Sequence, residues 1–208
     1  ISLGLVGSEM CIRDRGDVAA MKTAIASSGI TTSTTYNVTL TDTSVSVPDA
    51  NIVDADTTGI VTATITEGAL ATLAGLTGTG HAYTITLTDT TATASALTAL
   101  DAKTTVAVDA SSVTLVTGTA LELQTLYTLG ASGITGLAAE NLEITGTPSA
   151  AEANAVALLT IGTVTATLAT GTAADLNAAL TETSVNAWTM SVTHGGACLL
   201  YTSDAADE

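Results

Sequence analysis

Three aspartates, Asp42, Asp54 and Asp56, are the side chains of this sequence best suited to bind a metal ion. Ca²⁺ prefers carboxylate oxygens, and a calcium loop gathers several of them on one tight turn with glycine at the bend. Neither an EF-hand pattern nor the glycine–aspartate nonapeptide of calcium-binding β-rolls occurs here. We therefore expect the carboxylates to cap helices or to be solvated, and we keep a calcium-stabilised repeat as an alternative.

Histidine and hydroxyl chemistry has little support in the sequence. His81 and His194 are the only histidines, whereas a zinc site needs three or four convergent ligands. No serine lies in a G-x-S-x-G elbow, and the turn Gly78-Thr-Gly80 has no lysine of a phosphate-binding loop. We expect no catalytic residue, no metal ligand and no cofactor, and we predict that the protein is not an enzyme.

Threonines that alternate with apolar residues are the remaining feature with a chemical use. On parallel strands, Thr-x-Thr places hydroxyl and methyl groups about 4.8 Å apart across strands and about 6.7 Å apart along them. Such a grid resembles the ice-binding faces of β-solenoid antifreeze proteins, and a face of this kind could equally bind a glycan. Our default interpretation is the general preference of threonine for exposed strand positions. The candidate binding residues are Thr62, Thr64, Thr84, Thr86, Thr165 and Thr167.

Short strands are predicted to position these threonines, because apolar and polar residues alternate strictly. The strands begin near Asn37, Ile60, Ala82, Val106, Asn141, Thr163 and Ala187, and most lie 22 to 24 residues apart. The predicted inward column is Val38, Leu40, Val61, Ala63, Ile65, Tyr83, Ile85, Leu87, Val106, Val108, Leu142, Ile144, Val164, Ala166, Leu168, Trp188, Met190 and Val192.

Short helices are predicted between the strands, where leucines recur at helical spacing. Four of these segments open with a hydroxyl residue followed three positions later by a carboxylate, which is the capping-box pattern. Aspartate is a weaker partner than glutamate in this box. The predicted structural caps are Ser46 with Asp49, Thr119 with Glu122, Ser149 with Glu152, and Thr172 with Asp175.

One predicted strand and the helix after it form a strand–helix unit, and a longer repeat contains several of these units. Val61-Thr-Ala-Thr64 recurs as Val164-Thr-Ala-Thr167, and Ala82-Tyr-Thr84 recurs as Ala187-Trp-Thr189, at an offset of about 104 residues. A connection of strand, helix and next strand suits a parallel crossover rather than a hairpin. We predict an α/β repeat, namely a solenoid of short parallel threonine-rich strands alternating with short helices. The alternative is a string of small β-rich domains.

The charge balance excludes some partners. The chain has 20 acidic and four basic residues, for a formal net charge of −16. A nucleic-acid binder needs clustered lysine and arginine to neutralise phosphates, so we expect no nucleic-acid partner. Threonine interrupts every apolar run before it could span a bilayer, so we expect no membrane insertion.

The phrases AYTITLTDT, ALTALDAKTTVAVDASSVTLVTGTA and ENLEITGT resemble modules of very large Thr/Ala-rich tandem-repeat proteins of cyanobacteria and other aquatic bacteria. The resemblance covers essentially residues 23–193. It implies a secreted or cell-surface location and flanking repeats of the same parent chain as partners. The expected function is a non-catalytic structural or adhesive segment of a large extracellular bacterial surface protein.

Both ends of the chain resemble translated sequencing-adapter DNA. The stretches are LVGSEMCIRDR near the start and CLLYTSDAADE at the end, and they hold both cysteines and every arginine. We accordingly divide the chain into residues 1–15 as adapter artefact, residues 16–197 as a repeat fragment truncated at both ends, and residues 198–208 as adapter artefact. A metagenomic origin fits this pattern.

Overall fold

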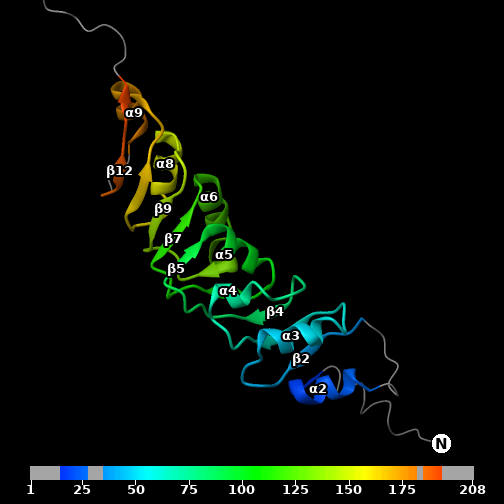
Figure 1. Ribbon diagram of the computed structural model, residues 1–208. Coiled ribbons are helices and arrows are strands. Elements are labelled where there is room, and N and C mark those ends of the chain that lie inside the picture. Colours follow the sequence, from blue (N-terminus) through cyan, green and yellow to red (C-terminus); the bar gives the residue numbers. More distant parts are fainter. Residues whose placement is uncertain (1–14, 28–34, 182–184, 194–208) are drawn as a thin grey trace, which may run out of the picture.

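The computed structural model describes residues 15–27, 35–181 and 185–193 of the 208-residue chain. The adapter-like stretches at residues 1–14 and 198–208, and His194, lie outside the described residues. Arg15, the last residue of the first stretch, is described and pairs with Thr39. Figure 1 shows an elongated molecule in which the chain advances steadily from one end to the other.

Short strands and short helices alternate along the described chain. The eight helices are α2 (Val18–Ile25), α3 (Val47–Asp54), α4 (Leu70–Leu73), α5 (Ala94–Asp101), α6 (Ala120–Thr128), α7 (Gly130–Gly133), α8 (Ala150–Ala157) and α9 (Ala173–Ala179). The strands are β1 (Arg15–Gly16), β2 (Val38–Leu40), β3 (Val61–Thr64), β4 (Ala82–Thr84), β5 (Thr91–Thr93), β6 (Val108–Asp109), β7 (Leu115–Gly118), β8 (Ile134–Thr135), β9 (Asn141–Ile144), β10 (Val164–Thr167), β11 (Gly171–Thr172), β12 (Ala187–Thr189) and β13 (Val192–Thr193).

Two larger parallel sheets run along the molecule. One has the strand order β1-β2-β3-β4, and the other has the order β12-β10-β9-β7-β5. Two smaller sheets pair β11 with β13 and β6 with β8, and every described strand pair is parallel. The predicted α/β class and the predicted parallel sheets are therefore confirmed.

In every described pair, the two strands are separated along the chain by a connection that contains at least one helix. Val38 is in register with Val61, and Val164 is in register with Leu142. Residues 81–87, which contain β4 and are called the β4 segment below, pair with residues 104–109 through isolated bridges from His81 to Thr104 and from Thr86 to Asp109. In Figure 1, β5, β7 and β9 lie side by side along one flank, and α5, α6 and α8 follow along the other.

The core is a narrow row of aliphatic side chains between strands and helices. Most of the predicted inward residues are buried, including Val38, Val61, Leu142 and Val164, which have no exposed surface. The leucines at helical spacing lie on the opposite wall of this core, with Leu97 and Leu123 fully buried. Small β-branched and aliphatic side chains thus suffice for a core that is only one strand–helix layer thick.

Three residues of the predicted inward column are exposed instead. Val106 is 37% exposed because β6 begins only at Val108, and the Val106 N–H is bonded to the hydroxyl of Thr104 in the preceding turn. Met190 and Val192 are 46% and 54% exposed, since no described strand lies beyond β12 and β13. For these three residues the prediction was wrong.

Five of the described strands, β1, β5, β7, β8 and β11, have no counterpart among the predicted strands. β5 lies between the predicted strands that begin near Ala82 and Val106, and β7 lies in the long predicted interval between Val106 and Asn141. β5 leads directly into α5, with Thr93 as its helix cap, and β7 ends one residue before the cap of α6. β7 reads Leu-Val-Thr-Gly, which does not alternate, and the buried residue of β5 is only an alanine between two threonines, so the alternation of apolar and polar residues does not reveal these two strands.

Candidate functional site

The six candidate threonines lie on the face of the strands that points away from the core. Thr64, Thr84, Thr86, Thr165 and Thr167 are exposed, and Thr62 is half-buried. Each is flanked along its strand by buried residues, as Thr84 is by Tyr83 and Ile85. The strand pleat therefore presents these hydroxyls to solvent.

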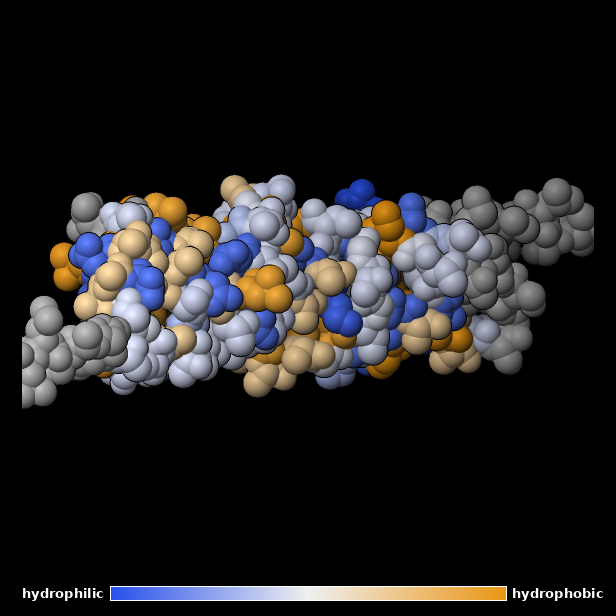
Figure 2. All heavy atoms as spheres, turned by 90° about the horizontal axis from the view of Figure 1, so that it is seen from above, coloured by the Kyte–Doolittle hydropathy of each residue, from blue (hydrophilic) through white to orange (hydrophobic). Residues whose placement is uncertain are grey.

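Neighbouring strands extend the threonine rows only over short distances. Thr39 is in register with Thr62, Thr64 with Thr84, and Thr167 with Thr189. Other residues interrupt the rows: Ala82 lies beside Thr62, Asp109 beside Thr86, and both Glu143 and Ala187 beside Thr165. Figure 2, a view onto one long side, shows apolar side chains scattered among polar ones rather than gathered in one patch.

All four predicted cap pairs stand at helix N-termini. The hydroxyls of Ser46, Thr119, Ser149 and Thr172 accept the backbone N–H three residues on, at 3.1–3.3 Å. In α6 and α8 the glutamate completes the box, since Glu122 and Glu152 each accept the N–H of the cap residue at 2.8 Å.

The two aspartate pairs make a smaller motif. Asp49 and Asp175 accept a hydrogen bond from the hydroxyl of the cap residue, at 3.0 and 2.7 Å, rather than from its backbone. Aspartate is one methylene shorter than glutamate, which accounts for the shorter reach. Asp49 is bonded in addition to Lys22 of α2, at 2.8 Å.

These contacts lower the pKa values of the capping carboxylates. The Thr119 N–H, then the Thr119 hydroxyl, lower the pKa of Glu122, and the same groups of Ser149 lower the pKa of Glu152. The hydrogen bond from Lys22, followed by that from Ser46, lowers the pKa of Asp49. Each carboxylate accepts hydrogen bonds that only its ionised form can fully use.

A second set of helix caps comes from the neighbouring strand–helix unit. Asp42 accepts the N–H of Val18 at 2.7 Å, Glu67 that of Val47 at 3.0 Å, and Asp89 that of Leu70 at 2.6 Å. The helices concerned are α2, α3 and α4, and each carboxylate follows the next strand along the chain. Local capping patterns do not reveal this set, because the partners lie about 20 residues apart along the chain.

Buried threonine hydroxyls form another link between successive units. Thr104, which is 7% exposed, donates to the carbonyl of Tyr83 at 2.7 Å and accepts the N–H groups of Tyr83 and Val106. Thr57 makes the same three bonds to Tyr36 and Gly59. We call this arrangement a threonine clamp, because one hydroxyl ties a loop to the backbone of the preceding strand segment.

Thr160 forms the third clamp. It donates to the carbonyl of Glu140 at 2.7 Å and accepts the N–H of Gly162 at 2.9 Å. A Cβ at Gly162 would lie 2.2 Å from that same carbonyl oxygen, so the close approach requires glycine. A threonine two residues before Gly59 or Gly162 was a signal that the sequence analysis could have used.

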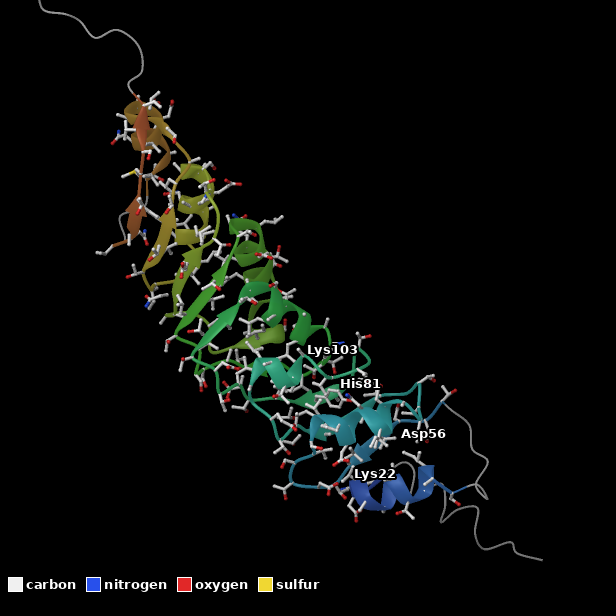
Figure 3. All side chains as sticks on the ribbon, in the orientation of Figure 1. Lys22, Asp56, His81 and Lys103 are labelled. Atoms are coloured by element: carbon white, nitrogen blue, oxygen red, sulfur yellow. The ribbon has the colours of Figure 1, made fainter. Side chains whose placement is uncertain are left out.

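His81 takes a comparable position between two units. It is 5% exposed, and its Nδ1 accepts the N–H of Val61 at 3.1 Å. Its Nε2 lies 2.7 Å from Oδ1 of Asp54, although no aligned hydrogen bond forms, and Asp54 also accepts the hydroxyl of Thr77. Figure 3 shows His81 between the ribbon of α3 and that of α4.

His81 and its neighbours Asp54 and Tyr83 form a packed contact between two units. A general base needs an accessible lone pair, and the lone pair on Nδ1 of His81 already accepts the N–H of Val61. The ring of Tyr83 lies 5.0 Å from the His81 ring, and burial, followed by the charge of Asp54, raises the pKa of Tyr83. Gly78, with φ of 63°, passes so close that a Cβ would meet His81 Nε2 at 2.3 Å.

The acidic residues considered as calcium ligands do not converge. Asp42 caps α2, Asp54 contacts His81, and Asp56 accepts the hydroxyl of Tyr36. Within the described part of the chain, no group of three or more His, Cys, Asp or Glu side chains could hold a metal ion. In the same residues, no helix has the length and apolar character needed to cross a bilayer.

Comparisons with protein-family models, with curated proteins and with solved structures found no match.

Proposed function

We propose that residues 16–197 form an α/β solenoid that serves as a non-catalytic structural or adhesive segment of a large extracellular bacterial surface protein. Successive strand–helix units are bonded to one another. The parallel registers, the carboxylates that cap a neighbouring helix and the threonine clamps all support this arrangement. A stack with these contacts can be lengthened without a change in its core.

Matching contacts in the two copies of the long repeat are the observation that carries this proposal. Asn51 bonds to the carbonyl of Gly75 and the N–H of Thr77, and Asn154, about 104 residues further on, bonds to the side chain and the N–H of Thr181. Asn37 and Asn141 likewise each accept an N–H of the following unit. The same sequence positions thus make the same kind of link.

Surface charge is consistent with an exposed, extended role. Residues 16–197 hold 15 acidic and two basic residues, and the resulting formal net charge of −13 keeps copies of such a filament apart at neutral pH, which favours solubility. A stalk of this kind holds a distal domain away from the cell. The resemblance to secreted repeat proteins, drawn from the sequence, supports the extracellular location.

A display experiment tests the stalk role. One, two or four copies of residues 16–197 are placed between a bacterial outer-surface anchor and a terminal epitope. Access of a bulky antibody to the epitope should rise with copy number, because each copy adds length. The matched control carries flexible Gly/Ser linkers with the same numbers of residues, whose mean end-to-end distance grows only with the square root of their length, whereas a stack of units grows in proportion to copy number. Equal access for both series at every copy number would refute the stalk.

The surface-binding and calcium alternatives have less support. A flat ice-binding grid needs unbroken threonine rows. Here Glu143 is the partner of Thr165 and Asp109 is the partner of Thr86, so both rows are interrupted by a carboxylate. An ice-recrystallisation assay on the folded protein tests the ice-binding alternative, and we expect no inhibition of recrystallisation.

A calcium-stabilised repeat would have a higher melting temperature in millimolar calcium, and we expect the melting temperature of this protein to stay unchanged.

A further inference from the structure

The outer edge of β12 and β13 differs from the corresponding edge of β4 in what covers it. The sequence repeat aligns Tyr83, Ile85 and Leu87 with Trp188, Met190 and Val192. The first three residues are 0%, 1% and 0% exposed. Trp188 is half-buried, and Met190 and Val192 are 46% and 54% exposed. The same inward positions are therefore sealed in one copy and open in the other.

Residues 102–109 provide the seal over the β4 segment. Thr104 clamps the backbone of Tyr83, and the N–H of Thr105 bonds to the carbonyl of His81. Further along, the N–H of Asp109 bonds to the carbonyl of Ile85, and the N–H of Leu87 bonds to the carbonyl of Asp109. Val108 lies in the core of this unit with no exposed surface.

The backbone of β12 is oriented to accept an equivalent strand. Thr189 and Ser191 direct their carbonyls to the inner edge, where Leu168 and Gly171 donate to them. Successive residues of a parallel strand point their backbone groups to alternate edges, so Trp188 and Met190 present theirs to the outer edge. The inner edge of β4 has the same pattern, since Thr84 accepts the N–H of Ile65.

We propose that the outer edge of β12 and β13 is a docking site for a parallel strand of the Thr-Thr-Val-Ala-Val-Asp type, carried by a further strand–helix unit. Its first threonine clamps the backbone of Trp188, as Thr104 clamps that of Tyr83. Its second valine packs on the side of the core that Met190 and Val192 leave open. This inference rests on the proposed solenoid and specifies the chemistry by which one unit recognises the next.

Trp188 reports this contact directly, because it is the only tryptophan of the chain. A copy of residues 89–118 is inserted after Thr193 of the full chain, where it stands in the same relation to β12 as the original does to β4, because Thr193 is the counterpart of Thr88. The added unit should shift the emission of Trp188 to the blue and reduce its quenching by acrylamide. Burial of an indole ring against apolar side chains causes both effects.

Two matched variants of the inserted unit serve as controls. The first carries the change equivalent to Val108→Asp, which places a charge where the core should close. The second carries the change equivalent to Thr104→Val, which keeps the shape and removes the clamp. The aspartate variant should leave Trp188 as quenchable as in the chain without the insertion, and the valine variant should protect it only in part.

Each outcome bears on the proposal. Protection of Trp188 by the native unit and its loss in the aspartate variant would support the docking edge. An inserted unit that adds helix by circular dichroism yet leaves Trp188 emission and quenching unchanged would overturn it. An inserted unit that adds no helix would overturn it too, because docking at this edge is what should fold the unit. Failure of the solenoid itself is seen separately, as tandem copies that do not lengthen.

Discussion

At the residue scale, buried hydroxyls and carboxylates tie successive units together. Thr57, Thr104 and Thr160 are 6–8% exposed, and each hydroxyl satisfies a carbonyl of the preceding unit together with a nearby N–H. A buried polar group without a partner is costly, so these hydroxyls make the narrow core specific as well as stable. The six candidate threonines of the strand faces make no such bond in the described structure, whereas Thr135 of β8, which is also exposed, donates to the carbonyl of Val108 at 3.2 Å.

Thr104→Val tests a clamp at constant shape. The substitution leaves the N–H and carbonyl of Tyr83 without their hydroxyl partner, and we expect it to lower the free energy of unfolding by about 1–3 kcal/mol. Urea denaturation measures the effect. The control is Thr84→Val on the exposed face, which should change stability by no more than about 0.5 kcal/mol. Equal effects at the two positions would contradict the clamp.

Gly162→Ala tests the close approach between units. The added methyl would lie 2.2 Å from the carbonyl oxygen of Glu140, so either the loop or β9 must move. We expect a loss of about 1–3 kcal/mol, as for other overpacked sites. Thermal unfolding measures it, with Gly75→Ala as the comparison, where the nearest atom would lie at 3.1 Å. A Gly162→Ala protein as stable as the Gly75→Ala protein would argue against tight packing there.

At the element scale, the helices are too short to persist alone, and their caps hold them in place. α6 and α8 use complete capping boxes within their own unit, whereas α2 and α4 receive a carboxylate from the next unit. The capping boxes of α6 and α8 could be predicted from the spacing of residues along the chain. The carboxylates that cap α2 and α4 could not be predicted, because they depend on which loop the fold brings beside the helix.

Removal of a cap hydroxyl should destabilise one helix in particular. Thr119→Ala deletes the acceptor for the Glu122 N–H and half of the capping box of α6. We expect a loss of about 0.5–2 kcal/mol, measured by chemical denaturation. Thr125→Ala, on the exposed face of the same helix, should be neutral or stabilising because alanine is the better helix former. The reverse order of the two effects would exclude the cap.

Acid should weaken the same caps. Folding lowers the pKa values of Glu122 and Glu152, so the unfolded chain takes up protons first as the pH falls. Their stabilisation is fully present above the ordinary glutamate pKa of 4.5 and disappears as the pH falls through the lower folded values. Asp101 acts in the opposite direction, because burial raises its pKa.

A double variant isolates the glutamates from other acid effects. In Glu122→Gln/Glu152→Gln, the melting temperature should fall less steeply between about pH 6 and about pH 3 than in the parent chain. The double variant should also be less stable than the parent at neutral pH, since it lacks the charged acceptors. Parallel pH profiles for the two proteins would mean that the boxes contribute nothing to the acid response.

At the scale of the whole molecule, the sequence predicted the α/β class, the parallel pairing and most of the core. Strict alternation placed Val38, Val61 and Leu142 inward, where they are buried. It did not reveal β5 or β7, which lead directly into helix caps, and it placed Met190 and Val192 in the core although both are exposed. Contacts such as those of Asp42 and His81 depend on which loops the fold brings together, and local spacing carries no information about that.

Small-angle X-ray scattering of one copy and of two tandem copies of residues 16–197 tests the central claim most directly. Because each unit bonds to its neighbours through the same edges, the second copy should extend the first. The maximum dimension should nearly double while the cross-sectional radius stays constant. Two copies that pack side by side, with a larger cross-section and little added length, or two globules joined by a flexible link, would contradict the solenoid.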